Sequence, residues 1–232
     1  MNQLNVVAVD ELDLSVAPFT WSFAAARRAE IDAHFEARRR QTPELWNGRV
    51  LLMSECALRE RTLRGTFFET DFASFLAWRD WGGPDQTITN CFAMGALRTT
   101  DGAFLVGVMG KHTANAGCIY FPAGTPEPAD IVGTKVDLES NVMREVTEET
   151  GLTAADLVRR PGWRAVVDGA RIALFKVLEA DVVADDLRAR ILGHLAQETQ
   201  PEFSDIRIVR GRGDLDPNMP GFVAAFLRQS LD

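Results

Sequence analysis

Cysteine is scarce in this chain of 232 residues, and the few cysteines present form no pair with metal-binding spacing. Cys56, Cys91 and Cys118 lie far apart in the sequence, and there is no CxxC motif. We expect all three to be reduced, half-buried core residues of a cytoplasmic protein. Long apolar runs are also missing, so the sequence predicts neither a signal peptide nor a membrane span.

An excess of basic charge is absent too. The chain has 25 Lys and Arg against 33 Asp and Glu, which gives a formal net charge of −8 at pH 7. This balance argues against non-specific binding to nucleic acid or to an anionic membrane surface. A phosphorylated substrate would need bound cations, or local Arg or Lys, to be attracted at all. Hydrophobic residues make up 46% and charged residues 25%, as in an ordinary globular protein that buries a substantial core.

Three carboxylates are crowded into one short segment, Arg144 to Leu152. Glu145, Glu148 and Glu149 stand in an i, i+3, i+4 relation, so a helix would place them on one face. Like charges at that spacing cost roughly 0.2–0.5 kcal/mol per pair, and a bound hard cation removes that cost. Because no His or Cys is nearby, these oxygen ligands favour Mg²⁺ or Mn²⁺ over zinc. A solvated acidic helix face is the alternative interpretation of the same pattern.

The segment Arg-Glu-Val-Thr-Glu-Glu-Thr-Gly-Leu resembles the second half of the Nudix box, Gly-x5-Glu-x7-Arg-Glu-U-x-Glu-Glu-x-Gly-U, in which U is a bulky aliphatic residue. Every specified position of that half matches. The first half departs, because Ala123 occupies the glycine position and lies twenty-one steps before Arg144 instead of fourteen. The loop over residues 125–136 is therefore extended by about seven residues. The early glutamate of the box has three imperfect candidates: Glu127, Asp130 and Asp137.

This resemblance implies an α/β fold, specifically an α/β/α sandwich with a mixed sheet, and hydrolysis of the diphosphate linkage in a nucleoside diphosphate derivative. In the family, the glutamates at the positions of Glu145, Glu148 and Glu149 hold Mg²⁺ or Mn²⁺, and a carboxylate such as Glu148 also takes a proton from water. A backbone carbonyl at the position of Ala123 or Gly124 often adds a metal ligand.

Arg144 and an acidic residue outside the box complete the expected site. Arg144 would hold a carboxylate in place by a charge-assisted hydrogen bond, and a surface ion pair with Glu148 is the alternative. Some family members complete the metal site with an acid from the loop that here spans residues 197–202. Glu198 is the first choice for that residue and Glu202 the second. Ordinary surface positions at a helix end are the alternative for both.

Two further residues are candidates for substrate contacts. Lys111 lies in a polar loop between two predicted strands and can reach a phosphate, although a solvated loop explains it equally well. Trp78 can stack on a nucleobase, or it can belong to the core of a small accessory layer.

The segment Leu45-Trp46-Asn47-Gly48-Arg49 is similar to the N-terminal layer of Nudix enzymes that act on UDP-sugars. A nucleotide-sugar or an ADP-ribose-like diphosphate is therefore preferred as substrate, ahead of coenzyme A derivatives. The alternative function is nucleotide binding or regulation by a Nudix-fold protein with weak or no turnover. The reason for this alternative is that the first half of the box does not match the family pattern.

The pattern divides the chain into an N-terminal α+β accessory region, residues 1–86, and a Nudix hydrolase domain, residues 87–232. The accessory region is predicted to hold a helix over 22–41, paired strands over 49–54 and 62–68, and a helix capped by Thr70. We expect it to form part of the substrate pocket or of a homodimer interface. The second region is predicted to hold strands over 91–97 and 103–108 as a hairpin, a strand over 118–121, the box helix capped by Asp137, strands over 163–167 and 171–178, a helix over 184–198, a strand over 206–209 and a final helix from 221.

Overall fold

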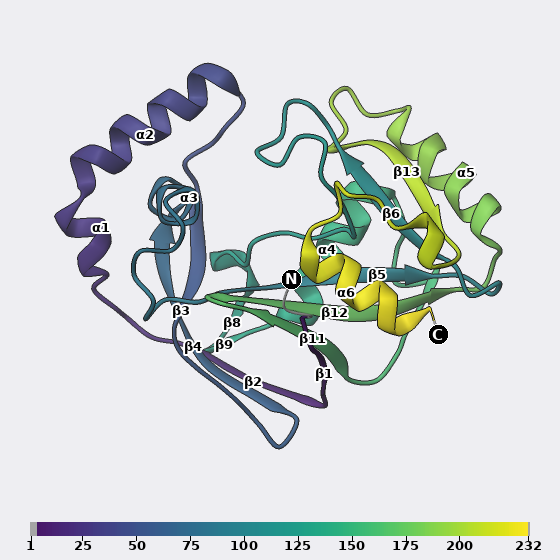
Figure 1. Cartoon of the computed structure of the whole chain (residues 1–232), viewed down its shortest axis with the longest axis horizontal. Coiled ribbons are helices and arrows are strands. Elements are labelled where there is room, and N and C mark those ends of the chain that lie inside the picture. The colour runs from purple at the N-terminus through teal and green to yellow at the C-terminus, as the bar shows by residue number, and fades with distance from the viewer. Residues whose placement is uncertain (1–3, 232) are drawn as a thin grey trace.

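A computed structural model describes residues 4–231 as two β-sheets that share one hydrophobic core. The smaller sheet and helices α1 to α3 occupy the left of Figure 1, and the larger sheet with α5 and α6 occupies the right. The smaller sheet has the order β3-β4-β2-β9-β8: β3 (Arg49–Arg59), β4 (Thr62–Asp71), β2 (Glu11–Val16), β9 (Lys135–Val136) and β8 (Ile131–Val132). The larger sheet has the order β1 (Val6–Val9), β11 (Trp163–Asp168), β12 (Arg171–Ala180), β5 (Asn90–Arg98), β6 (Phe104–Met109) and β13 (Phe203–Val209), with β10 (Leu157–Arg159) paired to β12 and β7 (Ile119–Tyr120) paired to β6.

The larger sheet is mixed and lies between two layers of helices. Strands β12 and β5 pair in parallel, whereas β11 with β12 and β6 with β13 pair antiparallel. Helices α4 (Leu138–Thr150) and α5 (Ala184–Leu195) contact each other, and α6 (Gly221–Ser230) packs on β11 and β1. Along β5, Gly95 lies against Val146 of α4, while Phe92 contacts Phe222 of α6 at 5.6 Å between ring centroids. Because side chains alternate along a strand, α4 and α6 cover opposite faces, and the expected α/β/α sandwich is confirmed.

Gly95 sets the distance between α4 and the sheet. A Cβ at this position would overlap Val146 and press on Leu178 and Val142, so any side chain here would push the helix outward. Val142 and Val146 are fully buried against β5 as a result. The face of α4 opposite these valines is then free to carry the charged residues of the box.

Helix α3 (Phe72–Asp80) separates β3 and β4 from the outermost helix, α2 (Arg28–Gln41), as Figure 1 shows. The helix expected over 22–41 is present, but it is interrupted at Arg27 between α1 (Ser22–Ala26) and α2. Asp71, not Thr70, caps α3, and its side chain accepts a hydrogen bond from the Ser74 backbone N–H at 2.9 Å. The cap is displaced by one residue because β4 continues through Asp71.

The two sheets exchange strands across the expected boundary at residue 86. Strand β1 precedes that boundary but pairs with β11 in the larger sheet, with Val6 opposite Val166. The extended loop lies after the boundary, yet it supplies β8 and β9 to the smaller sheet, where Ser15 pairs with Lys135. Lys135 Nζ also lies 2.6 Å from a carboxylate oxygen of Asp13. The division into residues 1–86 and 87–232 stays a prediction about the chain and does not describe the sheets.

The remaining elements differ from the expectations mainly at their ends. The hairpin of β5 and β6 turns at Asp101 and Gly102 as predicted, but α5 ends at Leu195 and not at Glu198, and β13 begins at Phe203. All three cysteines are free; Cys118 is half-buried, whereas Cys91 is fully buried and Cys56 is exposed, so the expectation of three half-buried thiols is wrong for two of them. Within residues 4–231, no helix has the length and apolar character needed to cross a membrane.

Candidate functional site

Helix α4 carries the box residues and is fixed at both ends by the residues that the sequence indicated. The side chain of Asp137 accepts hydrogen bonds from the backbone N–H groups of Glu139 at 3.1 Å and Ser140 at 3.0 Å. Gly151 ends the helix in the left-handed region with a φ of 70°, which a residue with a Cβ rarely adopts. Arg144 to Glu149 therefore lie on a regular helix of defined length.

Glu149 is a buried carboxylate with one oxygen left unpaired. The residue is 4% exposed, and its Oε2 accepts a hydrogen bond from the Ala123 backbone N–H at 3.0 Å. Its Oε1 is buried and has no hydrogen-bond partner among the described residues. Burial raises the pKa of Glu149 well above its usual value, and the charges of Glu202 and Glu145 raise it further. A buried oxygen acceptor without a donor is the arrangement that a bound cation would satisfy.

Glu145 lies directly under the loop that precedes the extended segment. A Cβ at Gly124 would overlap the carboxylate of Glu145, so only glycine permits this close approach of the backbone. Glu145 Oε1 is 2.7 Å from Arg144 Nη1, and the glutamate side chain is 13% exposed. Burial raises the pKa of Glu145 to about 7, although Arg144 acts in the opposite direction. The Ala123-Gly124 backbone thus lies against two box glutamates, and the backbone carbonyl that the resemblance implies as a metal ligand stays a prediction.

Glu148 is the most exposed of the three glutamates, with 60% of its side chain accessible and its Oε2 3.5 Å from Arg144 Nη1. Arg144 therefore draws both Glu145 and Glu148 toward itself. Among residues 4–231, no three His, Cys, Asp or Glu side chains converge in ligand geometry. The donor set nevertheless fits a hard cation, because it consists of carboxylate oxygens around the unpaired Oε1 of Glu149.

The two acidic candidates outside the box are placed differently. Glu198 follows the end of α5, and its Oε1 lies 3.5 Å from Nε2 of His194 in an exposed ion pair. Glu202 precedes β13, where its backbone carbonyl accepts a hydrogen bond from the Gly110 N–H at 2.7 Å. The charge of Glu202 raises the pKa of both Glu149 and Glu145, so its side chain lies near these two box glutamates. The structure thus brings Glu202, the second choice, to the box glutamates and directs Glu198, the first choice, toward His194.

Of the three candidates for the early glutamate of the box, Asp130 is the one that is buried against Arg144. Its side chain is only 4% exposed and lies 3.2 Å from Arg144 Nη2. It also accepts hydrogen bonds from the Asn141 side-chain amide at 3.0 Å and from the Glu127 backbone N–H at 2.9 Å. Glu127 reaches Arg144 only at 3.7 Å, and Asp137 is used as the helix cap. The extended loop therefore supplies an aspartate that pairs with Arg144.

Replacing Asp130 with asparagine is expected to destabilise the protein by about 1.5–3 kcal/mol, the value of hydrogen bonds to a charged group. The loss arises because Arg144 and Asn141 would face a neutral amide in a buried position. Urea unfolding followed by circular dichroism measures the change. Glu127→Gln is the matched control and should change stability by much less, because the Glu127 side chain is 44% exposed. Equal losses in both variants would contradict the assignment of Asp130.

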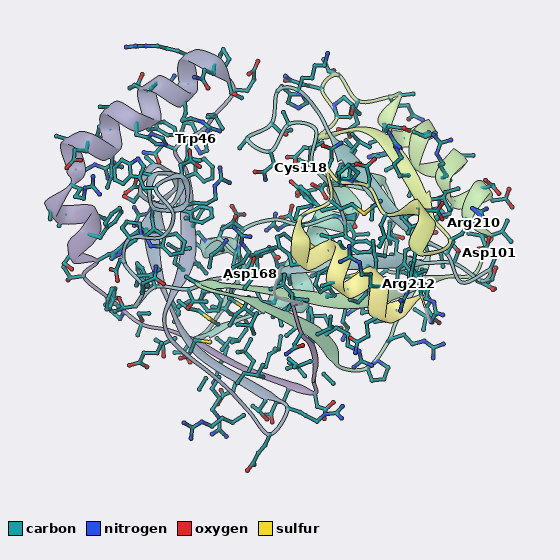
Figure 2. The ribbon with its side chains drawn as sticks, viewed as in Figure 1. Trp46, Asp101, Cys118, Asp168, Arg210 and Arg212 are labelled. Atoms are coloured by element: carbon teal, nitrogen blue, oxygen red, sulfur yellow. The ribbon has the colours of Figure 1, made fainter. Side chains whose placement is uncertain are left out.

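A cavity of about 390 Å³ opens beside Ala123 and Gly124, where α3 of the N-terminal layer faces β5 and α6. Cys118, labelled in Figure 2, is on its wall. The lining combines phenyl rings with polar and charged side chains. Its members include Phe75, Arg79, Asn90, Phe92, Arg171 and Phe222. The N-terminal layer therefore does contribute to the cavity next to the box, through α3.

The two substrate candidates named from the sequence do not line this cavity. Trp78 is 4% exposed, donates its indole N–H to the Asp85 backbone carbonyl at 2.9 Å and belongs to the core of the N-terminal layer. It borders only a neighbouring hollow of about 290 Å³. Lys111 is exposed in the loop after β6 and lines neither of these cavities. Asn90 and Arg171 were missed, although a polar residue opening a buried strand, as Asn90 does, is a signal that the sequence contains.

No family model matches this chain, and no curated protein matches it. Solved structures do. RenU, a Nudix hydrolase from M. smegmatis, is 18% identical over 60% of this chain and 81% of its own, with a TM-score of 0.36. The MutT protein from Methanosarcina mazei Go1 is 19% identical over 61% of this chain and 92% of its own, with a TM-score of 0.39.

The structure resembles those of Nudix hydrolases. The resemblance expected from the box segment is thereby confirmed. At these identities and TM-scores, the Nudix-like fold determines neither activity nor substrate, which depend on the residues described above.

Another match is NrtR from Shewanella oneidensis, which is 14% identical over 62% of each chain with a TM-score of 0.39. NrtR has also been solved in complex with a 27mer DNA. The expectation that the present chain binds no nucleic acid, made from its net charge, therefore stays a prediction.

Proposed function

We propose that this protein is a Mg²⁺- or Mn²⁺-dependent hydrolase that cleaves the diphosphate linkage of a nucleoside diphosphate derivative. The observation that carries the proposal is the buried Oε1 of Glu149, which has no partner among the described residues and lies among Glu145, Glu202 and the Gly124 backbone. Carboxylates that crowd one another in this way need a cation to offset their mutual repulsion. The cation held by these carboxylates would also give a negatively charged protein a means of attracting a diphosphate.

Each residue of the site has a distinct role in this proposal. Glu145, Glu148, Glu149 and Glu202 would hold the cation, which supplies an activated water and neutralises charge on the phosphate oxygens. Glu148 and Glu202 are the exposed members of the set and are free to accept a proton from the attacking water. Arg144, held by Asp130, positions Glu145 and does not itself line the cavity where substrate would enter.

The cavity beside Gly124 supports a nucleotide-sugar or an ADP-ribose-like diphosphate as the substrate. Its volume of about 390 Å³ accommodates one half of such a molecule, with the diphosphate extending over the box glutamates. Arg79 and Arg171 add positive charge to a chain whose net charge is −8. Coenzyme A derivatives remain the further alternative, because they too present a nucleoside diphosphate.

A regulatory nucleotide-binding module without turnover is the alternative function. The retention of three helix glutamates, together with Glu202 against Glu149, argues against it, because a site that only senses a nucleotide does not need a cluster of carboxylates.

Activity is expected only in the presence of Mg²⁺ or Mn²⁺, since Arg144 alone among residues 4–231 brings a positive charge to the box glutamates. The measurement is phosphate released by an added phosphatase from the products of a panel of UDP-sugars, ADP-ribose and coenzyme A. Each compound is tested with metal, with EDTA, and with metal restored after EDTA. Full turnover in EDTA would contradict the metal role, and no turnover of any compound with metal present would favour the regulatory alternative.

A further inference from the structure

The cavity next to the box is enclosed by aromatic rings from two different layers of the molecule. Phe75 comes from α3 in the N-terminal layer, and Phe222 comes from the first turn of α6. Phe222 packs edge-on against Phe92, which also lines the cavity, at 5.6 Å between ring centroids. The guanidinium of Arg79 lies 5.9 Å from the Phe75 ring centroid, and that of Arg171 lies 5.3 Å from the Phe222 centroid. Such flat apolar walls suit a planar ring better than a puckered sugar, whose hydroxyl groups would lose hydrogen bonds to water.

Asn90 is the polar group that this cavity leaves without a partner. The residue is 8% exposed, and its backbone N–H is bound to the Ala170 carbonyl at 2.9 Å. Its Oδ1 is buried and has no hydrogen-bond partner among residues 4–231. Asn90 borders both this cavity and the neighbouring hollow, so a rotation about its Cβ–Cγ bond can turn the amide oxygen or nitrogen toward a ligand. A side-chain amide offers an acceptor and a donor side by side, which matches the edge of a nucleobase.

The two arginines place the charged part of the ligand. Arg79 is held by Asn115 Oδ1 at 3.3 Å, which connects the N-terminal layer to the loop before β7. Arg171 lies 3.7 Å from Asp168 and is 38% exposed, so its guanidinium remains accessible from the cavity. Both arginines and Gly124 line the cavity, and Gly124 lies next to Glu145. A ligand whose base lies in the cavity therefore has its phosphates directed toward the carboxylates.

We propose that this cavity binds the nucleoside half of the substrate, with the base between the Phe75 and Phe222 sides and its N–H edge bound by the Asn90 amide. The inference rests on the proposed function for its account of the diphosphate, but base binding itself needs neither metal nor turnover. It makes Asn90 a specificity-determining residue that lies outside the box.

Calorimetric titration of the full chain with UMP, AMP and glucose 1-phosphate, without metal, tests this assignment. We expect UMP or AMP to bind at least ten times more tightly than glucose 1-phosphate. Asn90→Ala should weaken that nucleotide about tenfold, the effect of one lost hydrogen bond in a buried site. Asn218→Ala is the matched control, because Asn218 is exposed and does not line the cavity, and the affinity of this variant should be unchanged. Asn90→Asp keeps the shape of the side chain and serves if the alanine variant does not fold.

Tighter binding of glucose 1-phosphate than of either nucleotide would overturn the inference, as would nucleotide affinity unchanged in both Asn90 variants. Turnover distinguishes the two proposals. Nucleotide binding that depends on Asn90, without hydrolysis of any compound in Mg²⁺, would remove the proposed function and leave the base site. Hydrolysis in Mg²⁺, with nucleotide affinity unchanged in the Asn90 variants, would support the proposed function and rule out the base site.

Discussion

Replacing Glu149 with glutamine is expected to lower kcat for diphosphate hydrolysis by roughly 10²–10³-fold or more, the cost of losing one group that stabilises charge in a transition state. Glutamine can still accept the hydrogen bond from the Ala123 N–H through its amide oxygen, so the loop and the helix should keep their positions. What is lost is the negative charge that Glu145 and Glu202 crowd at this point. Steady-state kinetics at saturating Mg²⁺ measures the effect.

Stability provides the control for the same variant. Without metal, the Glu149→Gln protein should unfold at the same urea concentration as the parent or at a higher one, because a buried and uncompensated carboxylate has been neutralised. A large loss of stability together with the loss of activity would mean that Glu149 is a structural residue. Near-parental kcat in a folded Glu149→Gln protein would contradict the metal site itself.

Glu202→Gln is expected to lower kcat by at least ~10²-fold with little change in KM, the low end of what a positioned general base contributes. The reason is the charge of Glu202, which raises the pKa of Glu149 and of Glu145 and so lies near the carboxylates that would hold the cation. Glu198→Gln is the matched control, because it makes the same substitution in the same loop at a glutamate that contacts His194 and not the box. Its kcat should stay within about twofold of the parent, as for most surface substitutions.

The comparison of these two variants also decides between two ways of completing the site. A large loss of kcat in Glu198→Gln with a small loss in Glu202→Gln would show that Glu198, the first choice from the sequence, completes the site. If neither variant loses much kcat, the carboxylates of α4 alone are sufficient to hold the cation.

Local signals in the sequence predicted most of the individual elements. The cap at Asp137 and the left-handed Gly151 bound the box helix, and the Asp101-Gly102 turn forms the expected hairpin. These features depend on residues close in sequence, where propensity and hydrogen bonding to neighbours determine the result. Ala123 and Gly124 lie against box glutamates, and the backbone carbonyl expected there as a metal ligand stays a prediction.

What the sequence did not predict depends on contacts between distant segments. The choice between Glu198 and Glu202 turned on where α5 ends and β13 begins, because the last turn expected for the helix does not form. Asp130 could not be singled out from Glu127 and Asp137, since only the fold of the extended loop buries it against Arg144. Asn90 has no partner that could be identified from spacing. Its significance appears only when α3, β5 and α6 enclose a common cavity.

The exchange of β1 and of the β8–β9 pair between the two sheets has a consequence for how the chain acquires its fold. During synthesis, the smaller sheet cannot be completed until residues 131–136 have been made. Strand β1 likewise cannot pair until β11, residues 163–168, has been made. Neither sheet can therefore form completely from the N-terminal half of the chain alone. Contacts of such long sequence separation slow folding and make it cooperative. Residues 1–86 therefore depend on the rest of the chain to complete their sheet, and the larger sheet depends on them for β1. A chimaera that exchanged residues 1–86 for those of another protein would lack native strand partners in both sheets.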